Sequence, residues 1–414
     1  MSLEKINLYL TVLLVLCIAF YFSVPELYPL VEAGESKHTL LLLFFLLTIA
    51  TFNFTRSFRL NRAQVDVFLL LILVYFVMIF SSFWSLYLNL DWVAIRVATY
   101  FILMFAAFFF WSSLVAYSGI NPLYVLSVCV LLASIAHAVF GFLSYSGIAF
   151  ISLQPIENDR MFGLSQPNFL SQTIACGVIS LIYIVHNQKG FFKFILILVV
   201  LPFLMYCLIA AGSRGVILGL VLALFLFYST FFLEFLKKDL FSKSIKLMFF
   251  LCLMLALPFF AFIVYDNFRL GPREYIFGES LKFFATGSFN EILFGKGYGQ
   301  NSQHVRAVVG HGSHNDWIRL LVDLGMVGLL LIASSIFSII AIVYRGLRKS
   351  NYSSSFVLAS SAFFITVGFT NSGLFYMNYT HYMFFVAVLA SGLSLKSRFT
   401  YCNRASDISK TSSI

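Results

Sequence analysis

Long apolar runs, separated by short polar stretches, repeat from one end of the chain to the other. Most runs are about 20 residues long, which is the length at which an α-helix crosses the hydrocarbon core of a bilayer. We therefore predict an all-α integral membrane protein with about twelve transmembrane helices. The predicted spans cover approximately residues 7–24, 38–54, 65–83, 93–117, 121–143, 168–185, 194–210, 215–233, 247–265, 316–344, 354–371 and 377–395.

Composition supports this interpretation. Hydrophobic residues make up 61% of the 414 residues and charged residues 11%, against about 25% charged residues in a soluble domain. The first apolar run is followed by Pro25 and acidic residues rather than by a small-residue cleavage site. We therefore interpret this run as the first span and not as a cleaved signal peptide.

The formal charge of +10 is an orientation signal rather than a sign of nucleic-acid binding. If both termini are cytoplasmic, most of the 27 lysines and arginines fall in cytoplasmic connections, and few of the 17 acidic residues do. This is the distribution of the positive-inside rule. We predict a multi-pass inner-membrane protein with both termini in the cytoplasm, with membrane lipids and no nucleic acid among its partners.

Residues 1–396 form a single predicted membrane domain, and residues 397–414 a polar cytoplasmic tail. Two connections are long, at about residues 144–167 and 266–315, and both face outward, away from the cytoplasm, in this topology. A loop of about 50 residues is well above the usual connection length, and such loops are often functional. Within the second loop, residues 279–286 are predicted to form a short helix on the membrane surface.

The predicted spans contain few ionisable side chains. His137 is the one titratable residue that we place well inside a span. Transporters usually need acidic residues or histidines at membrane depth, and many have inverted internal repeats, which we do not find. This pattern disfavours a flippase or other transporter and places the candidate chemistry at the outer surface of the membrane.

Four polar segments fall on that surface, at residues 160–168, 212–215, 269–275 and 295–317. Arg214 lies at the apex of a short turn between two apolar helices, where Gly212 and Gly215 permit a tight fold. Its planar guanidinium suits a phosphate group. The alternative for such arginines, and above all for Arg160, is a contact with lipid headgroups.

Gly295, Gly297 and Gly299 are spaced as in a dinucleotide-binding loop, but no βαβ unit surrounds them. A nicotinamide or flavin site is therefore not expected. We predict instead that these glycines permit a sharp turn or a close approach of backbone segments.

His311 and His314 precede a helix start that Asn315 or Ser313 can cap. The pair lacks a third ligand at metal-binding spacing, and the chain contains no Asp-x-Asp motif. A neutral histidine needs no metal to act as a general base, since its ordinary pKa lies near working pH. We interpret His314 as a candidate base and His311 as a loop-stabilising residue, with no metal and no cofactor.

Arginines beside one histidine suit the transfer of a group from a pyrophosphate. Arg214 and Arg273 can stabilise the charge of the departing pyrophosphate, and His314 can deprotonate an acceptor hydroxyl. The donor is expected to be lipid-linked, because nucleotide sugars are absent outside the cytoplasm.

The order of these motifs resembles that of the bacterial O-antigen ligase and O-antigen polymerase superfamily. The resemblance rests on the glycine-rich segment, on His314-Asn315 and on the run 320–330 that follows, and it covers roughly residues 160–335. The segments at Arg160, Arg214 and Arg273 also look like that family.

The resemblance implies an integral-membrane glycosyltransferase with a C-type bundle and a long periplasmic loop. Such enzymes take a glycan from undecaprenyl pyrophosphate by a metal-independent, inverting attack. It further implies that His314 is the base and that Arg214 and Arg273 hold the pyrophosphate, with Arg269 as a competitor for the role of Arg273. Further candidates for substrate binding are Arg160, Asn168, His311 and Asn315.

These motifs do not identify the acceptor of the glycan. A ligase attaches the finished O-antigen to lipid A–core, whereas a polymerase joins repeat units of a surface polysaccharide to one another. Both need an acceptor hydroxyl beside a basic pyrophosphate site, so the shared motifs do not separate them. We favour the ligase, with the polymerase as the alternative and a lipid-linked glycan flippase behind both.

Overall fold

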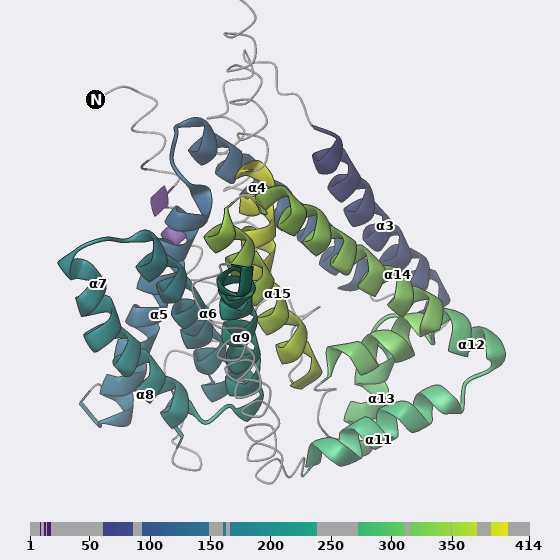
Figure 1. The fold of residues 1–414 in the computed structure, drawn as a ribbon. Coiled ribbons are helices and arrows are strands. Elements are labelled where there is room, and N and C mark those ends of the chain that lie inside the picture. Colours follow the sequence, from purple (N-terminus) through teal and green to yellow (C-terminus); the bar gives the residue numbers. More distant parts are fainter. Residues whose placement is uncertain are drawn as a thin grey trace, which may run out of the picture.

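The computed structural model describes residues 9, 12–13, 15–17, 61–85, 93–148, 160–162, 166–237, 272–310, 315–348, 350–370 and 382–395. All regular secondary structure in these ranges is helical (Figure 1). Six helices are long and apolar enough to cross a membrane, and three shorter apolar helices accompany them. The all-α membrane class is therefore confirmed for this part of the chain. The predicted spans 38–54 and 247–265, most of 7–24, and the tail lie outside the described residues.

Most predicted spans within the described ranges match an observed helix to within a few residues. The matching helices are α3 (Arg62–Ser85), α4 (Val93–Tyr117), α5 (Pro122–Tyr145), α6 (Pro167–Asn187), α9 (Arg214–Lys237) and α15 (Asn351–Thr370). The last predicted span corresponds to the helix Tyr382–Leu395. Local chemistry fixes several ends: the Asn121 side chain accepts from the backbone N–H groups of Leu123 and Tyr124 at the start of α5, as N-cap residues do.

The predicted span 194–210 contains a change of helix type. It consists of α7 (Phe191–Ile195), a π-helical turn η2 (Leu196–Val200) and α8 (Leu201–Ala211). The π-helical turn ends two residues before Pro202, which has no N–H for the carbonyl of Leu198. Such a local change of pitch accommodates the proline without ending the helix.

Helix α6 lies at the centre of the bundle formed by α5, α6, α8, α9 and α15 (Figure 1). It is buried along most of its length. A side-chain Cβ at Gly177 of α6 would overlap with Ser134 of α5, and the Ser134 hydroxyl donates to the carbonyl of Thr173 at 2.7 Å. Small residues thus allow α5 and α6 to approach closely, as is common between membrane helices.

Polar side chains join the helices at one end of this bundle, which we call the tyrosine end (Asn121, Tyr183, Thr230, Ser353 and Ser355). Asn121 Nδ2 donates to the Tyr183 hydroxyl at 3.0 Å, and this hydroxyl lies 3.1 Å from Ser353 Oγ. Thr230 of α9 and Ser355 of α15 are also hydrogen-bonded. The two ends of each bundle helix therefore have different chemistry, because the opposite end carries the arginines described below.

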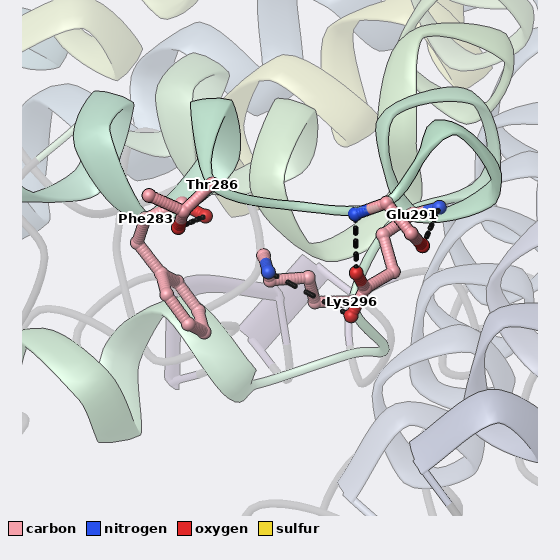
Figure 2. A network of polar contacts seen from close by, with 5 residues as sticks. Phe283, Thr286, Glu291 and Lys296 are labelled. Atoms are coloured by element: carbon pink, nitrogen blue, oxygen red, sulfur yellow. Dashed lines mark hydrogen bonds and ion pairs between the residues drawn. The ribbon is translucent and has the colours of Figure 1, made fainter.

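The predicted loop 266–315 contains three helices in its described part: α11 (Pro272–Ala285), α12 (Phe289–Phe294) and α13 (Gln300–Val309). We call them the α11–α13 unit. The short helix predicted at 279–286 is part of the longer α11. Figure 2 shows Lys296 between Glu291, at 3.6 Å, and the ring of Phe283, whose centroid is 4.4 Å from Nζ. The ring of Phe283 also stacks on His304 of α13, with centroids 4.0 Å apart.

A capping box orders the start of α12. The Ser288 hydroxyl accepts from the N–H of Glu291, while the Glu291 carboxylate accepts from the N–H of Ser288 at 2.7 Å. These hydrogen bonds, led by the one from the Ser288 backbone, hold the pKa of Glu291 below its ordinary value. The local sequence therefore folds this part of the predicted loop into fixed structure.

The single span predicted at 316–344 is interrupted. Helix α14 (Asp316–Leu347) breaks at Gly325, whose φ of 69° and ψ of −176° are not helical. Residues 316–324 form a separate arm, while residues 326–347 are about 33 Å long at the usual rise per residue and suffice to cross a bilayer. The predicted span 316–344 matches α14, but the break at Gly325 was not predicted, because apolar periodicity does not reveal a glycine in an unusual conformation.

Candidate functional site

Arg160 joins two helices at the end of the bundle opposite the tyrosine end. Its Nε donates to the carbonyl of Ala211 at 2.9 Å, and a terminal guanidinium nitrogen donates to Asn168 Oδ1 at 3.2 Å. The next residue, Met161, donates its N–H to the carbonyl of Ala210 at 3.0 Å. Residues 160–162 are therefore fixed between the end of α8 and the first turn of α6.

The turn before Arg214 is built around Gly212. Gly212 has a φ of 67° and ends α8, and a Cβ on it would approach Arg160 Nε to 3.2 Å. The glycine thus serves both the turn and the close contact with Arg160, which confirms its predicted turn role. Gly215, by contrast, is already helical within α9, so its predicted role in the turn was wrong. Arg214 is the first residue of α9 and is exposed.

Arg273 enters the same region from the first turn of α11. Burial, and in second place the positive charge of Arg160, lower the pKa of the Arg273 guanidinium from its ordinary value. Burial likewise lowers the pKa of Arg160. Arginine nevertheless keeps its charge in proteins, so both residues contribute positive charge. We call this end of the bundle, with Arg160, Asn168, Arg214 and Arg273, the arginine end.

Helix starts add to the positive potential of the arginine end. Asn168 lies in the first turn of α6, Arg214 begins α9 and Arg273 lies in the first turn of α11. The N-cap of α6, Gln166, makes no side-chain capping bond. Backbone N–H groups at a helix start are favourable partners for an anion. Arg160 with its partner Asn168, Arg214 and Arg273 thus lie at or beside the first turns of three helices, although they come from three separate segments of the sequence.

A buried ion pair in the arm was missed by the sequence-based interpretation. Arg319 Nε and Asp323 Oδ2 lie 3.3 Å apart, with side-chain exposures of 6% and 1%. The Arg319 guanidinium also lies over the ring of Tyr298, 5.3 Å from its centroid. Opposite charges four residues apart in an apolar helix are the signal that would have revealed this pair.

The glycine-rich segment lies against the break in α14. Gly295, Gly297 and Gly299 all have positive φ angles, and a Cβ at Gly295 would overlap with the backbone of Asp323 and Gly325. Backbone hydrogen bonds seal this contact, from Lys296 N to the carbonyl of Val322 at 2.9 Å and from Gly297 N to that of Asp323 at 3.0 Å. The predicted close approach of backbone segments is confirmed.

Asn315 caps α14, since its side chain accepts from the N–H of Ile318 at 3.0 Å. This confirms one of the two predicted capping residues. His311, His314 and Ser313 lie outside the described residues, as does Arg269. The connection 311–314 joins Gly310, which ends α13, to Asn315.

Over the described ranges, no group of three His, Cys, Asp or Glu side chains is arranged to hold a metal ion. The basic groups at the arginine end are suited instead to an anionic ligand, since guanidinium groups donate to phosphate oxygens in pairs. Comparison of the chain with protein-family models found no family that matches, and no curated protein matches it either.

Proposed function

We propose that the protein transfers a glycan from a polyprenyl diphosphate, most naturally undecaprenyl pyrophosphate, to an acceptor hydroxyl. The observation that carries the proposal is Arg160, which hydrogen bonds hold between the end of α8 and the first turn of α6, together with the positive charges of Arg214 and Arg273 at the starts of α9 and α11. Arg160 and Arg273 are both partly buried, and the positive charge of Arg160 disfavours the charged form of Arg273 and helps to lower its pKa. A bound anion relieves this repulsion, and a diphosphate offers enough oxygens for several arginines.

The proposed chemistry follows from the charge. The bond between the anomeric carbon and the diphosphate oxygen breaks, and Arg160, Arg214 and Arg273 stabilise the negative charge that develops on the leaving group. The acceptor oxygen attacks the opposite face of the sugar and forms the new glycosidic bond, so the configuration inverts. His314 takes the proton of the hydroxyl as general base. No metal is required in this scheme.

The resemblance described above supports the finer assignment, which is O-antigen ligation to lipid A–core at the periplasmic face of the bacterial inner membrane. In this assignment both termini are cytoplasmic, and the arginine end faces the periplasm. Polymerisation of repeat units by the same site is the alternative. The flippase is less favoured, because the tyrosine end is joined by neutral hydrogen bonds among α5, α6, α9 and α15.

The deciding experiment is a deletion strain whose surface polysaccharide is separated on gels and probed for both lipopolysaccharide and undecaprenyl-linked glycan. A ligase predicts bare core and long chains on the lipid carrier, whereas a polymerase predicts core capped by one repeat unit. Complementation with wild type should restore the profile, and complementation with Arg273→Ala should not. An unchanged profile after deletion would overturn the proposal.

A further inference from the structure

The carboxylate of Asp323, in the arm of α14, makes hydrogen bonds with the start of α13. Its Oδ2 accepts from the N–H of Gly299 and its Oδ1 from the N–H of Asn301, each at 2.9 Å. From its own helix it accepts from Arg319 Nε at 3.3 Å. Asp323 thus binds the start of α13 to the arm of α14 through both carboxylate oxygens.

Stability alone is a weak explanation for a buried ion pair. Removing two charges from water costs about as much as their attraction returns, and apolar residues of similar volume often stabilise a fold equally well. What this carboxylate adds is geometry. Its two oxygens accept hydrogen bonds from the N–H groups of Gly299 and Asn301, which fixes the position and the direction of the start of α13.

Contacts lead from α13 to α11, the helix that carries Arg273. Helix α13 packs against α11 through the stacked rings of His304 and Phe283, and Lys296 lies over the same Phe283 ring (Figure 2). Helix α11 also packs against α14. Arg273 lies in the first turn of α11, so its position depends on how the α11–α13 unit is seated on the arm.

We propose that Asp323 is a positioning residue for the diphosphate site. It seats the α11–α13 unit on the arm and thereby holds Arg273 in position, without touching the ligand itself. The binding site is then composite: the bundle provides Arg160 and Arg214, and the α11–α13 unit provides Arg273. This inference rests on the proposed binding of a diphosphate.

The test uses the purified full-length protein in lipid nanodiscs and geranylgeranyl diphosphate as the probe. Asp323→Asn keeps the shape of the side chain but loses the charge and one acceptor oxygen. We expect its Kd for the probe to rise about tenfold, toward that of Arg273→Ala, because a displaced arginine loses most of its contact with the ligand. Asp66→Asn, the same substitution in α3, is the matched control and should change the Kd by less than about twofold.

The double variant Arg273→Ala/Asp323→Asn separates positioning from general damage. If Asp323 acts through Arg273, Asp323→Asn has almost no further effect once Arg273 is absent. Independent, multiplying effects of the two substitutions on Kd would overturn the proposal. If Asp323→Asn does not accumulate, Asp323→Glu is the second variant, since it keeps the charge but shifts the carboxylate by one methylene. We expect Asp323→Glu to weaken probe binding when Arg273 is present and to have almost no effect in Arg273→Ala.

Hydrogen exchange distinguishes this inference from the proposed function. In Asp323→Asn the amides of 272–310 should exchange faster than in wild type, while those of α6 should not. Faster exchange with unchanged probe affinity would overturn the positioning role, and unchanged exchange would do so as well. Wild-type protein that does not bind the probe at all would overturn the diphosphate site itself, whatever the exchange shows.

Discussion

The two ends of the bundle use polar side chains in opposite ways. At the tyrosine end, Asn121, Tyr183 and Ser353 are neutral and satisfy one another through hydrogen bonds. At the arginine end, Arg160 and Arg273 carry the same charge; burial disfavours the charged form of both, and the charge of Arg160 adds to this effect at Arg273. Neutral donors and acceptors can satisfy each other's hydrogen-bonding groups, whereas two cations repel each other.

This contrast separates a structural network from a binding site on physical grounds. The tyrosine end needs nothing from outside the protein, because each named hydroxyl or amide has a partner on another helix. The arginine end is suited to an anion, since guanidinium groups donate to phosphate oxygens in pairs. The predictions below test whether activity belongs to the arginine end and stability to the tyrosine end.

The largest effect is expected from His314→Ala. Loss of the general base should reduce glycan transfer by about a hundredfold to ten-thousandfold without lowering the amount of protein in the membrane. The matched control is His186→Ala, since His186 lies at the tyrosine end among Phe227, Tyr228 and Tyr352. Gel analysis of glycan ladders measures both variants, and a wild-type ladder from His314→Ala would refute the base assignment.

A smaller but clear loss is expected from Arg214→Lys. An ammonium group keeps the charge but does not reproduce the guanidinium fork, so transfer should fall by about tenfold or more. The matched control is Arg348→Lys, because Arg348 is exposed and follows the end of α14 that is farthest from the arm. Its transfer rate should stay within about twofold of wild type. Initial rates at saturating acceptor provide the measurement. Full activity of Arg214→Lys would mean that only its charge or packing matters.

At the tyrosine end, Tyr183→Phe should affect stability and not chemistry. The substitution removes the hydroxyl shared by Asn121 and Ser353 and should cost about 1–3 kcal/mol of the free energy of unfolding. We expect the Tm of the purified protein to fall by a few degrees, with the transfer rate per folded molecule unchanged. A large fall in that rate, at temperatures where the variant is folded, would break the division between the two ends.

The smallest effect is expected from chelation. The sequence offers no metal-ligand spacing around His311 and His314 and no Asp-x-Asp motif, so arginines alone are proposed to stabilise the leaving group. Transfer in membranes should therefore survive excess EDTA. Activity that is lost with EDTA and restored by a divalent cation would replace the arginine-only scheme with a metal-assisted one.

The helices were predictable from sequence because their ends and lengths follow from local chemistry. The predicted span 93–117 matches α4, and α5 begins where Asn121 and Pro122 provide a cap and a first turn. The break at Gly325 was not predictable in this way. It depends on Gly295, 30 positions earlier in the chain, whose backbone meets Gly325 without room for a Cβ at either residue.

The candidate site was predictable as a list of residues but not as an arrangement. Arg160, Arg214 and Arg273 stand out because charges are rare beside apolar runs. Their sequence positions do not reveal that Arg160 donates to the carbonyl of Ala211, or that Arg273 is held by a folded unit and not by a loose loop. The Arg319–Asp323 pair was missed because it lies inside a stretch that is apolar on average.

The seating of α13 on the arm has a consequence for the order in which the chain folds. Asp323 reaches Gly299 and Asn301 across only 24 and 22 residues, whereas Ser112 and Ser394 meet across 282. Contacts between near neighbours in sequence form quickly, and distant ones wait for the rest of the chain. Residues 272–324 can therefore assemble during synthesis, before α15 has been made. The newly made protein would hold Arg273 in a finished unit while the last helices are still entering the membrane.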